Sequence, residues 1–114
     1  MSTVTGREAE RLAADYLKKK HHKILAQNWR SRWCEIDIIS QRWGRIYFVE
    51  VKYRANSASG SGLEYITPKK LQQMRFAAEF WIAQNRKPAE GYQLAAIELT
   101  GRPPEITRWV SNVI

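Results

Sequence analysis

Four charged residues in the middle of the sequence lie at spacings that suit phosphodiester chemistry. Glu35 and Asp37 belong to the run CEIDIIS, and Glu50 and Lys52 belong to the run FVEVKYR. Both runs alternate in the manner of β-strands, in which residues two apart point to the same face at a separation of about 6.7 Å. If the apolar faces of the two strands coincide, the three carboxylates and the ammonium group also share a face.

Such crowding of carboxylates favours a metal-binding function. Like charges a few ångströms apart repel each other, and a hard divalent cation relieves the repulsion. Bound Mg²⁺ or Mn²⁺ can lower the pKa of a water molecule and neutralise charge on a phosphate. Lys52 would then orient the water or stabilise the pentavalent phosphorus. The alternative is that these groups form ion pairs on a solvated sheet face, because antiparallel sheets often leave one face in water.

Hydrophobic periodicity indicates the elements that must position these residues. Residues 6–20 are expected to form a helix, because apolar side chains recur at helical spacing and lysines occupy its C-terminal end. His21 and His22 follow it and are expected to form a solvated helix end rather than a metal site. Thr67 and Pro68 are a favourable N-cap and first residue for a second helix. The expected strands are residues 23–30, 34–40, 45–54, 92–100 and 105–110, with a turn at 41–44 and a mobile Gly- and Ser-rich loop at 55–62.

The strand at residues 45–54 has two faces of different character. One face is apolar throughout and should pack on the helices, whereas the other begins apolar and becomes charged at Glu50 and Lys52. In the neighbouring strand, Ile36 and Ile38 are expected to share a face. The order α-β-β-β-α-β predicts a single α/β (α+β) domain over residues 1–114, with a mixed central sheet flanked by helices.

The charge balance indicates the class of partner. The chain of 114 residues has 19 Lys and Arg against 11 Asp and Glu, a net charge of +8, which favours a polyanion such as nucleic acid. No run approaches the roughly 20 apolar residues of a membrane helix, and the first residues lack the pattern of a secretory signal. The single cysteine, Cys34, excludes an internal disulfide and a cysteine-built zinc site. A cytoplasmic location without membrane association is therefore expected.

Several runs of the sequence resemble the YraN-like family of small bacterial proteins. They are W-R-x-R-x-C-E-I-D-I-I, F-V-E-V-K-Y-R, E-R-L-A-A-D-Y-L and I-T-P-K-K-L, and the resemblance covers nearly the whole chain. That family is similar to the PD-(D/E)xK nuclease superfamily and especially to archaeal Holliday-junction resolvases. The resemblance implies a restriction-endonuclease-like αβββαβ core that cleaves DNA with Mg²⁺ or Mn²⁺.

The resemblance also implies roles for individual residues. Asp37 matches the first acid of the nuclease motif, and Glu50 with Lys52 matches its (D/E)xK pair, so these three are the expected catalytic residues. Glu10 matches a glutamate that the first helix of such resolvases often contributes, whereas helix phase alone leaves Glu8 and Glu10 open. The expected metal ligands are Asp37, Glu50, Glu35 and Glu10.

Basic and aromatic residues form the expected nucleic-acid surface. The expected nucleic-acid contacts are Arg30, Arg32, Arg54 and Lys70. Lys70 flanks the apolar stripe of the second helix, whereas Lys69 points away from it. Trp29 and Trp33 lie among the arginines and can stack on bases, although Trp29 suits the core better.

These features lead to one main functional hypothesis and two alternatives. The main hypothesis is a metal-dependent endonuclease-like protein that hydrolyses DNA, such as branched or damaged DNA. The first alternative is a nucleic-acid-binding protein that keeps the nuclease fold without significant cleavage. The second is an interaction module whose basic surface binds an acidic protein. Symmetrical cutting of two strands would require a homodimer.

Overall fold

A computed structural model describes residues 4–55, 66–87 and 91–111 of the chain. The elements are α1 (Val4–Lys19), β1 (Lys23–Arg30), β2 (Glu35–Arg42), β3 (Arg45–Arg54), α2 (Pro68–Gln84), β4 (Gln93–Thr100) and β5 (Glu105–Ser111). The element order agrees with the prediction, although several boundaries differ by one or two residues. Most of the predicted loop at residues 55–62 lies outside the described residues.

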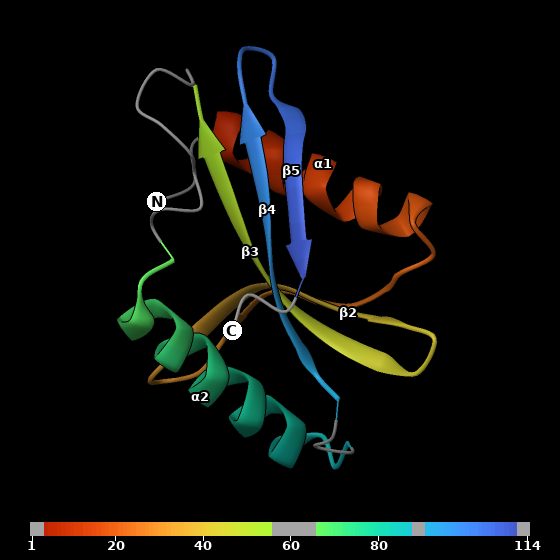
Figure 1. Cartoon of the computed structure of the whole chain (residues 1–114), viewed down its shortest axis with the longest axis vertical. Coiled ribbons are helices and arrows are strands. Elements are labelled where there is room, and N and C mark those ends of the chain that lie inside the picture. Colours follow the sequence, from red (N-terminus) through yellow and green to blue (C-terminus); the bar gives the residue numbers. More distant parts are fainter. Residues whose placement is uncertain (1–3, 56–65, 88–90, 112–114) are drawn as a thin grey trace.

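The strands form one mixed sheet in the order β1-β2-β3-β4-β5 (Figure 1). The first three strands make an antiparallel meander, β3 and β4 run parallel, and β5 returns antiparallel to β4. The parallel pair requires a crossover, and α2 lies on the connection between its two strands. The predicted αβββαβ core with a mixed central sheet is therefore confirmed.

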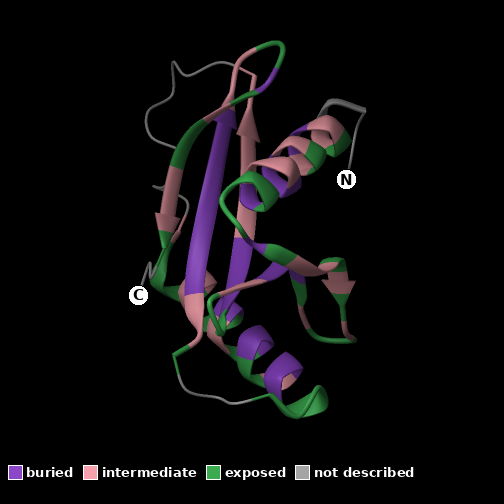
Figure 2. Ribbon diagram, turned by 90° about the vertical axis from the view of Figure 1, so that its right-hand side faces the viewer, coloured by how far each residue is buried: buried purple, intermediate pink, exposed green. Residues whose placement is uncertain are grey.

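The two helices cover opposite faces of the sheet. Tyr47 and Val49 of β3 pack in one core cluster with the buried residues of α1. The alternate residues Ile46 and Phe48 pack in a second cluster with α2. Buried residues accordingly occupy the central strands and the inward sides of both helices (Figure 2). The prediction that the uniformly apolar face of this strand packs on both helices is wrong, because only α1 covers it.

Ile36 and Ile38 do not share a packing environment, contrary to the prediction. Ile38 belongs to the cluster beneath α1, whereas Ile36 belongs to the cluster beneath α2. Strict alternation would have placed both on one side. Asp37 lies between them, so the change of environment occurs at the residue that carries the expected chemistry.

The hairpin turn between β2 and β3 is shorter than predicted. The strands continue to Arg42 and from Arg45, which leaves Trp43 and Gly44 as the turn in place of residues 41–44. Their φ angles of 51° and 78° are both positive. Two positive φ angles in a two-residue loop match the twist of a β-hairpin, so the tight turn prevails over the longer one.

His22 is buried, contrary to the expectation of a solvated helix end. His21 adopts a φ of 72°, its N–H donates to the carbonyl of Lys18, and the His22 N–H donates to the carbonyl of Leu17. This Schellman arrangement ends α1 and turns the chain back towards the sheet. The His22 ring is only 5% exposed, and its Nδ1 lies 2.8 Å from the Oγ of Ser40. The burial lowers the pKa of His22 to about 4, assisted by the charge of Arg42.

No helix in the described part of the chain is long and apolar enough to cross a membrane.

Candidate active site between β2 and β3

The backbone ladder between β2 and β3 ends just before the charged residues. The last pair on this side of the hairpin is Ile38 with Val49. One residue further along each strand are Asp37 and Glu50. The Asp37 carboxylate accepts a hydrogen bond of 2.7 Å from the backbone N–H of Val51. The Asp37 side chain is thereby held against β3, and its carboxylate lies in the electrostatic field of Glu50.

The Asp37 carboxyl group holds its proton far more tightly than an exposed aspartate. Burial, together with the neighbouring Glu50 carboxylate, raises the pKa of Asp37 from its ordinary value of 3.8 to about 7. Glu10 of α1 adds a smaller repulsion, while the Val51 N–H and the charge of Lys70 act in the opposite direction. Near neutral pH the group is consequently poised between its charged and neutral forms. A cation next to it would favour the charged form.

Lys70 in the first turn of α2 provides a positive charge beside these carboxylates. Its Nζ lies 3.3 Å from the Oε2 of Glu50, and both side chains are largely shielded from water. The helix starts in the right place because the Thr67 hydroxyl accepts a 3.1 Å hydrogen bond from the Lys70 backbone N–H, a normal N-cap contact. The predicted nucleic-acid contact at Lys70 therefore lies directly beside Glu50, whereas Lys69 is exposed as expected.

The four predicted metal ligands are not brought together as one group. Among the described residues, no three His, Cys, Asp or Glu side chains form a cluster that could hold a metal. Glu35 is 65% exposed and pairs instead with Arg30 of β1, at 3.4 Å. The negative charge of Glu10 acts on Asp37, because it contributes to the raised pKa of that carboxyl group. The close acidic pair consists of Asp37 and Glu50.

The three predicted arginines have different surroundings. Arg30 is exposed and paired with Glu35. The Arg32 guanidinium lies 6.0 Å from the centre of the Trp33 ring, at the turn before β2. Arg54 is half-buried at the end of β3. Lys70, by contrast, forms an ion pair with Glu50.

Comparison with known proteins gives the family of the chain. A profile of the family described as "Uncharacterised protein family UPF0102" matches residues 9–99. A UPF0102 protein of Neisseria gonorrhoeae is 37% identical over 109 residues, which span 95% of this chain and 92% of that protein. A UPF0102 protein of Vibrio campbellii is 34% identical over 113 residues, spanning 96% and 90% of the two chains. The chain belongs to the UPF0102 family. This confirms the YraN-like resemblance, while the relation to nucleases stays a prediction.

The UPF0102 segment contains one acidic residue that the sequence reasoning missed. Glu98 of β4 is only 7% exposed and stands in register with Lys52 of β3. Its neighbours Ile97 and Leu99 belong to the cluster beneath α1, so by alternation Glu98 faces the same side as Glu50 and Lys52. The sequence signal that could have identified Glu98 is a single acid within the hydrophobic stretch LAAIEL.

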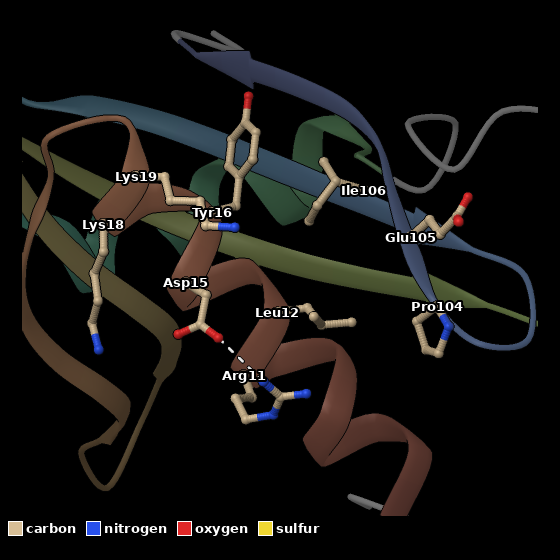
Figure 3. A pocket seen from close by; sticks show the side chains of 9 residues that line it. All are labelled: Arg11, Leu12, Asp15, Tyr16, Lys18, Lys19, Pro104, Glu105 and Ile106. Carbon is tan, nitrogen blue, oxygen red and sulfur yellow. Dashed lines mark hydrogen bonds and ion pairs between the residues drawn. The ribbon is translucent and has the colours of Figure 1, made fainter.

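A larger cavity of this UPF0102 chain lies away from these acids. It has a volume of about 680 Å³ and lies between α1 and the start of β5 (Figure 3). Arg11 and Asp15 line it and pair with each other at 3.2 Å. The rest of the lining is formed by Leu12, Tyr16, Lys18, Lys19, Pro104, Glu105 and Ile106. Because neither Asp37 nor Glu50 lines it, this cavity is separate from the candidate active site.

Proposed function

We propose that this UPF0102 protein is a metal-dependent endonuclease that hydrolyses phosphodiester bonds in DNA, with branched or damaged DNA as the preferred class. The observation that carries the proposal is the arrangement of Asp37 beside Glu50 with Lys70 at 3.3 Å from Glu50. Lys52 follows Glu50 on the same face of β3, as required by the (D/E)xK resemblance. The net charge of +8 supports a polyanionic substrate.

The residues fit a hard divalent cation held by two carboxylates. Mg²⁺ is commonly bound by one or two carboxylates, with water and substrate phosphate completing its shell, so a cluster of three acids is not required. Burial and, after it, the like charge of Glu50 raise the pKa of Asp37, and a cation between the two carboxylates would relieve their repulsion. Asp37 and Glu50 are accordingly the proposed ligands, with Glu10 as an outer charge.

The bound metal would supply a water of lowered pKa and neutralise charge on the scissile phosphate. The protein side chains do the remaining work. Asp37 is oriented by the N–H of Val51 and therefore does not need to reorganise on binding. Lys70 exchanges its contact with Glu50 for a phosphate oxygen when DNA arrives. Lys52 stabilises the negative charge that grows on the non-bridging phosphate oxygens as the water oxygen bonds to phosphorus and the bridging P–O bond breaks.

The proposal includes a homodimeric state and a cytoplasmic location. Cutting two strands symmetrically would use a homodimer, because each copy supplies one site. The single cysteine agrees with a reducing compartment such as the cytoplasm. The binding-only alternative keeps the same DNA contacts but requires no metal.

The decisive experiment incubates the purified protein with plasmid, single-stranded and four-way-junction DNA, in parallel with Mn²⁺, Mg²⁺ and EDTA. We expect cleavage only with a divalent cation. Asp37→Asn and Glu50→Gln should abolish cleavage and spare most DNA binding, while Lys52→Ala should slow it by about 100-fold or more. Glu105→Gln is the matched control, since Glu105 is an exposed acid outside the site.

Metal binding is measured separately from cleavage by thermal unfolding. Mn²⁺ at 100 times its dissociation constant should stabilise the wild type by about 2.7 kcal/mol and should do little for Asp37→Asn. If the wild type cuts none of the three substrates in Mn²⁺ but binds them, the protein is a binding protein with a nuclease-like fold. Absence of both cleavage and salt-sensitive DNA binding would instead favour the protein-interaction alternative.

A further inference from the structure

Four aromatic side chains form a continuous surface beside the candidate active site. We call it the aromatic surface; its residues are Trp29, Trp33, Phe76 and Phe80. Phe80 lies at the centre, with its ring stacked on that of Phe76 at 6.2 Å between centroids and an interplanar angle of 10°. The rings of Trp29 and Trp33 each lie 6.0 Å from the Phe80 ring. Two distant parts of the sequence thus build one surface: the segment from the end of β1 to the turn before β2, and helix α2.

The outer rings of this surface are exposed to an unusual degree. Trp33 is 67% exposed and Phe76 is 52% exposed. A contiguous exposed group of aromatic rings marks an interaction site more often than a scattered apolar residue does. Trp43 at the hairpin turn is 82% exposed but is not part of such a group. Its ring packs against the Arg42 guanidinium, at 4.5 Å, rather than against the rings of the aromatic surface.

Shallow cavities join the aromatic surface to the candidate active site. One of about 250 Å³ lies between Trp33, Lys69 and Phe76. A second, of about 190 Å³, is also lined by Trp33 and extends to Lys70, which pairs with Glu50. Both volumes lie below the usual range of pockets that enclose a small molecule. The surface therefore suits flat rings that lie on it rather than a ligand enclosed by it.

Charge decides which occupant fits. Arg30 and Arg32 precede Trp33 in the chain, and the Arg32 guanidinium lies 6.0 Å from the Trp33 ring. Lys69 lines the first cavity and Lys70 the second, which Glu35 also lines, so that basic groups outnumber acidic ones among these residues. A second copy of the chain would bring the same basic groups against these and be repelled. Single-stranded nucleic acid brings phosphates for the cations and bases for the rings, and base–aromatic stacking is independent of sequence.

We propose that the aromatic surface stacks unpaired nucleobases beside Asp37 and Glu50, so that the preferred nucleic-acid ligand contains a single-stranded segment. The inference rests on the proposed function only in taking nucleic acid as the partner. The bases would lie on Trp33 and Phe76, and the strand would continue past Lys70 to the acids of β2 and β3. Specificity would thus come from the absence of base pairing and not from base sequence.

The test measures binding in EDTA, so that cleavage plays no part. A labelled oligothymidine and a labelled blunt-ended duplex, which has no unpaired bases, are titrated with wild type, Trp33→Ala and Phe76→Ala. We expect oligothymidine affinity to fall about 5- to 100-fold in each variant, and duplex affinity to change less than about twofold. Trp43→Ala is the control, as a tryptophan outside the surface that is more exposed than Trp33, and should bind both probes like the wild type. Thermal unfolding verifies that each variant is folded.

The outcomes separate this proposal from the nuclease proposal. Equal weakening for both probes, or none for either, overturns the stacking role even if the protein cleaves DNA. Selective loss for oligothymidine upholds it even if no substrate is ever cleaved. Sedimentation velocity provides a further check. A wild-type dimer that becomes monomeric in Phe76→Ala would assign the surface to self-association and overturn the proposal.

Discussion

Replacing Asp37 with asparagine should stabilise the metal-free protein at alkaline pH. Because the pKa of Asp37 is raised from 3.8 to about 7, folding favours its protonated form. The contribution of Asp37 to stability is therefore greatest at pH values below about 4 and is lost as the pH rises through 7. Asparagine is neutral at every pH and keeps an oxygen that can accept the N–H of Val51.

The magnitude follows from the size of the pKa change. A rise of about three pKa units corresponds to about 4 kcal/mol, and partial solvent screening reduces it to about 2–4 kcal/mol. For a domain of this size each kcal/mol shifts Tm by about 4 °C, so Asp37→Asn should melt about 8–16 °C above wild type at pH 8.5. Below pH 4 the two proteins should differ little, because both side chains are then neutral.

The assay is thermal or urea unfolding followed by circular dichroism between pH 4 and 9 in EDTA. Asp15→Asn is the matched control, because Asp15 forms an exposed pair with Arg11, and such pairs contribute about 0–1 kcal/mol. A variant at Asp37 that is less stable than wild type at pH 8.5 would refute the reasoning. A stability difference that does not change with pH would refute it equally.

Three further predictions concern other groups of the fold. His22, with a pKa of about 4, should resist protonation in the folded protein. Its contribution to stability should therefore fall by up to about 3 kcal/mol as the pH drops from about 6.5 to 4. An NMR titration of the His22 ring with a midpoint near 6.5 would contradict this prediction. Lys70→Ala should tighten Mn²⁺ binding about two- to fivefold by removing the cation beside Glu50, whereas Lys69→Ala should not, as measured by calorimetry. Thr67→Ala should lower the free energy of unfolding by about 1 kcal/mol, because it removes the N-cap acceptor of α2; urea titration would show no change if the cap contributed nothing.

Local patterns were sufficient to predict the elements and their order. Strict alternation identified β2 and β3, and Thr67-Pro68 marked the start of α2 at the correct residue. Helix phase also distinguished Lys70, which is partly buried, from Lys69, which is exposed. These predictions succeeded because each depends on neighbours within one helix or one strand.

Properties that depend on how the elements meet were not predictable in the same way. The separate environments of Ile36 and Ile38 arise where β2 leaves β3 and the two core clusters adjoin. The pairing of Glu35 with Arg30 depends on the register between β1 and β2. The position of Glu98 beside Lys52 depends on parallel pairing across the α2 crossover. No spacing within one segment encodes these three relations.

The topology of the sheet has a consequence for how the chain folds. Asp37 and Glu50 belong to one β-hairpin closed by the two-residue turn at Trp43 and Gly44, and such local contacts form early. The parallel pairing of β3 with β4 requires the chain to close a much longer loop through α2, and loops of this kind form slowly. We therefore expect the two mutually repelling acids to approach each other before Lys70 is in place beside them. If so, a divalent cation or a proton on Asp37 would speed the completion of the sheet as well as stabilise the folded protein.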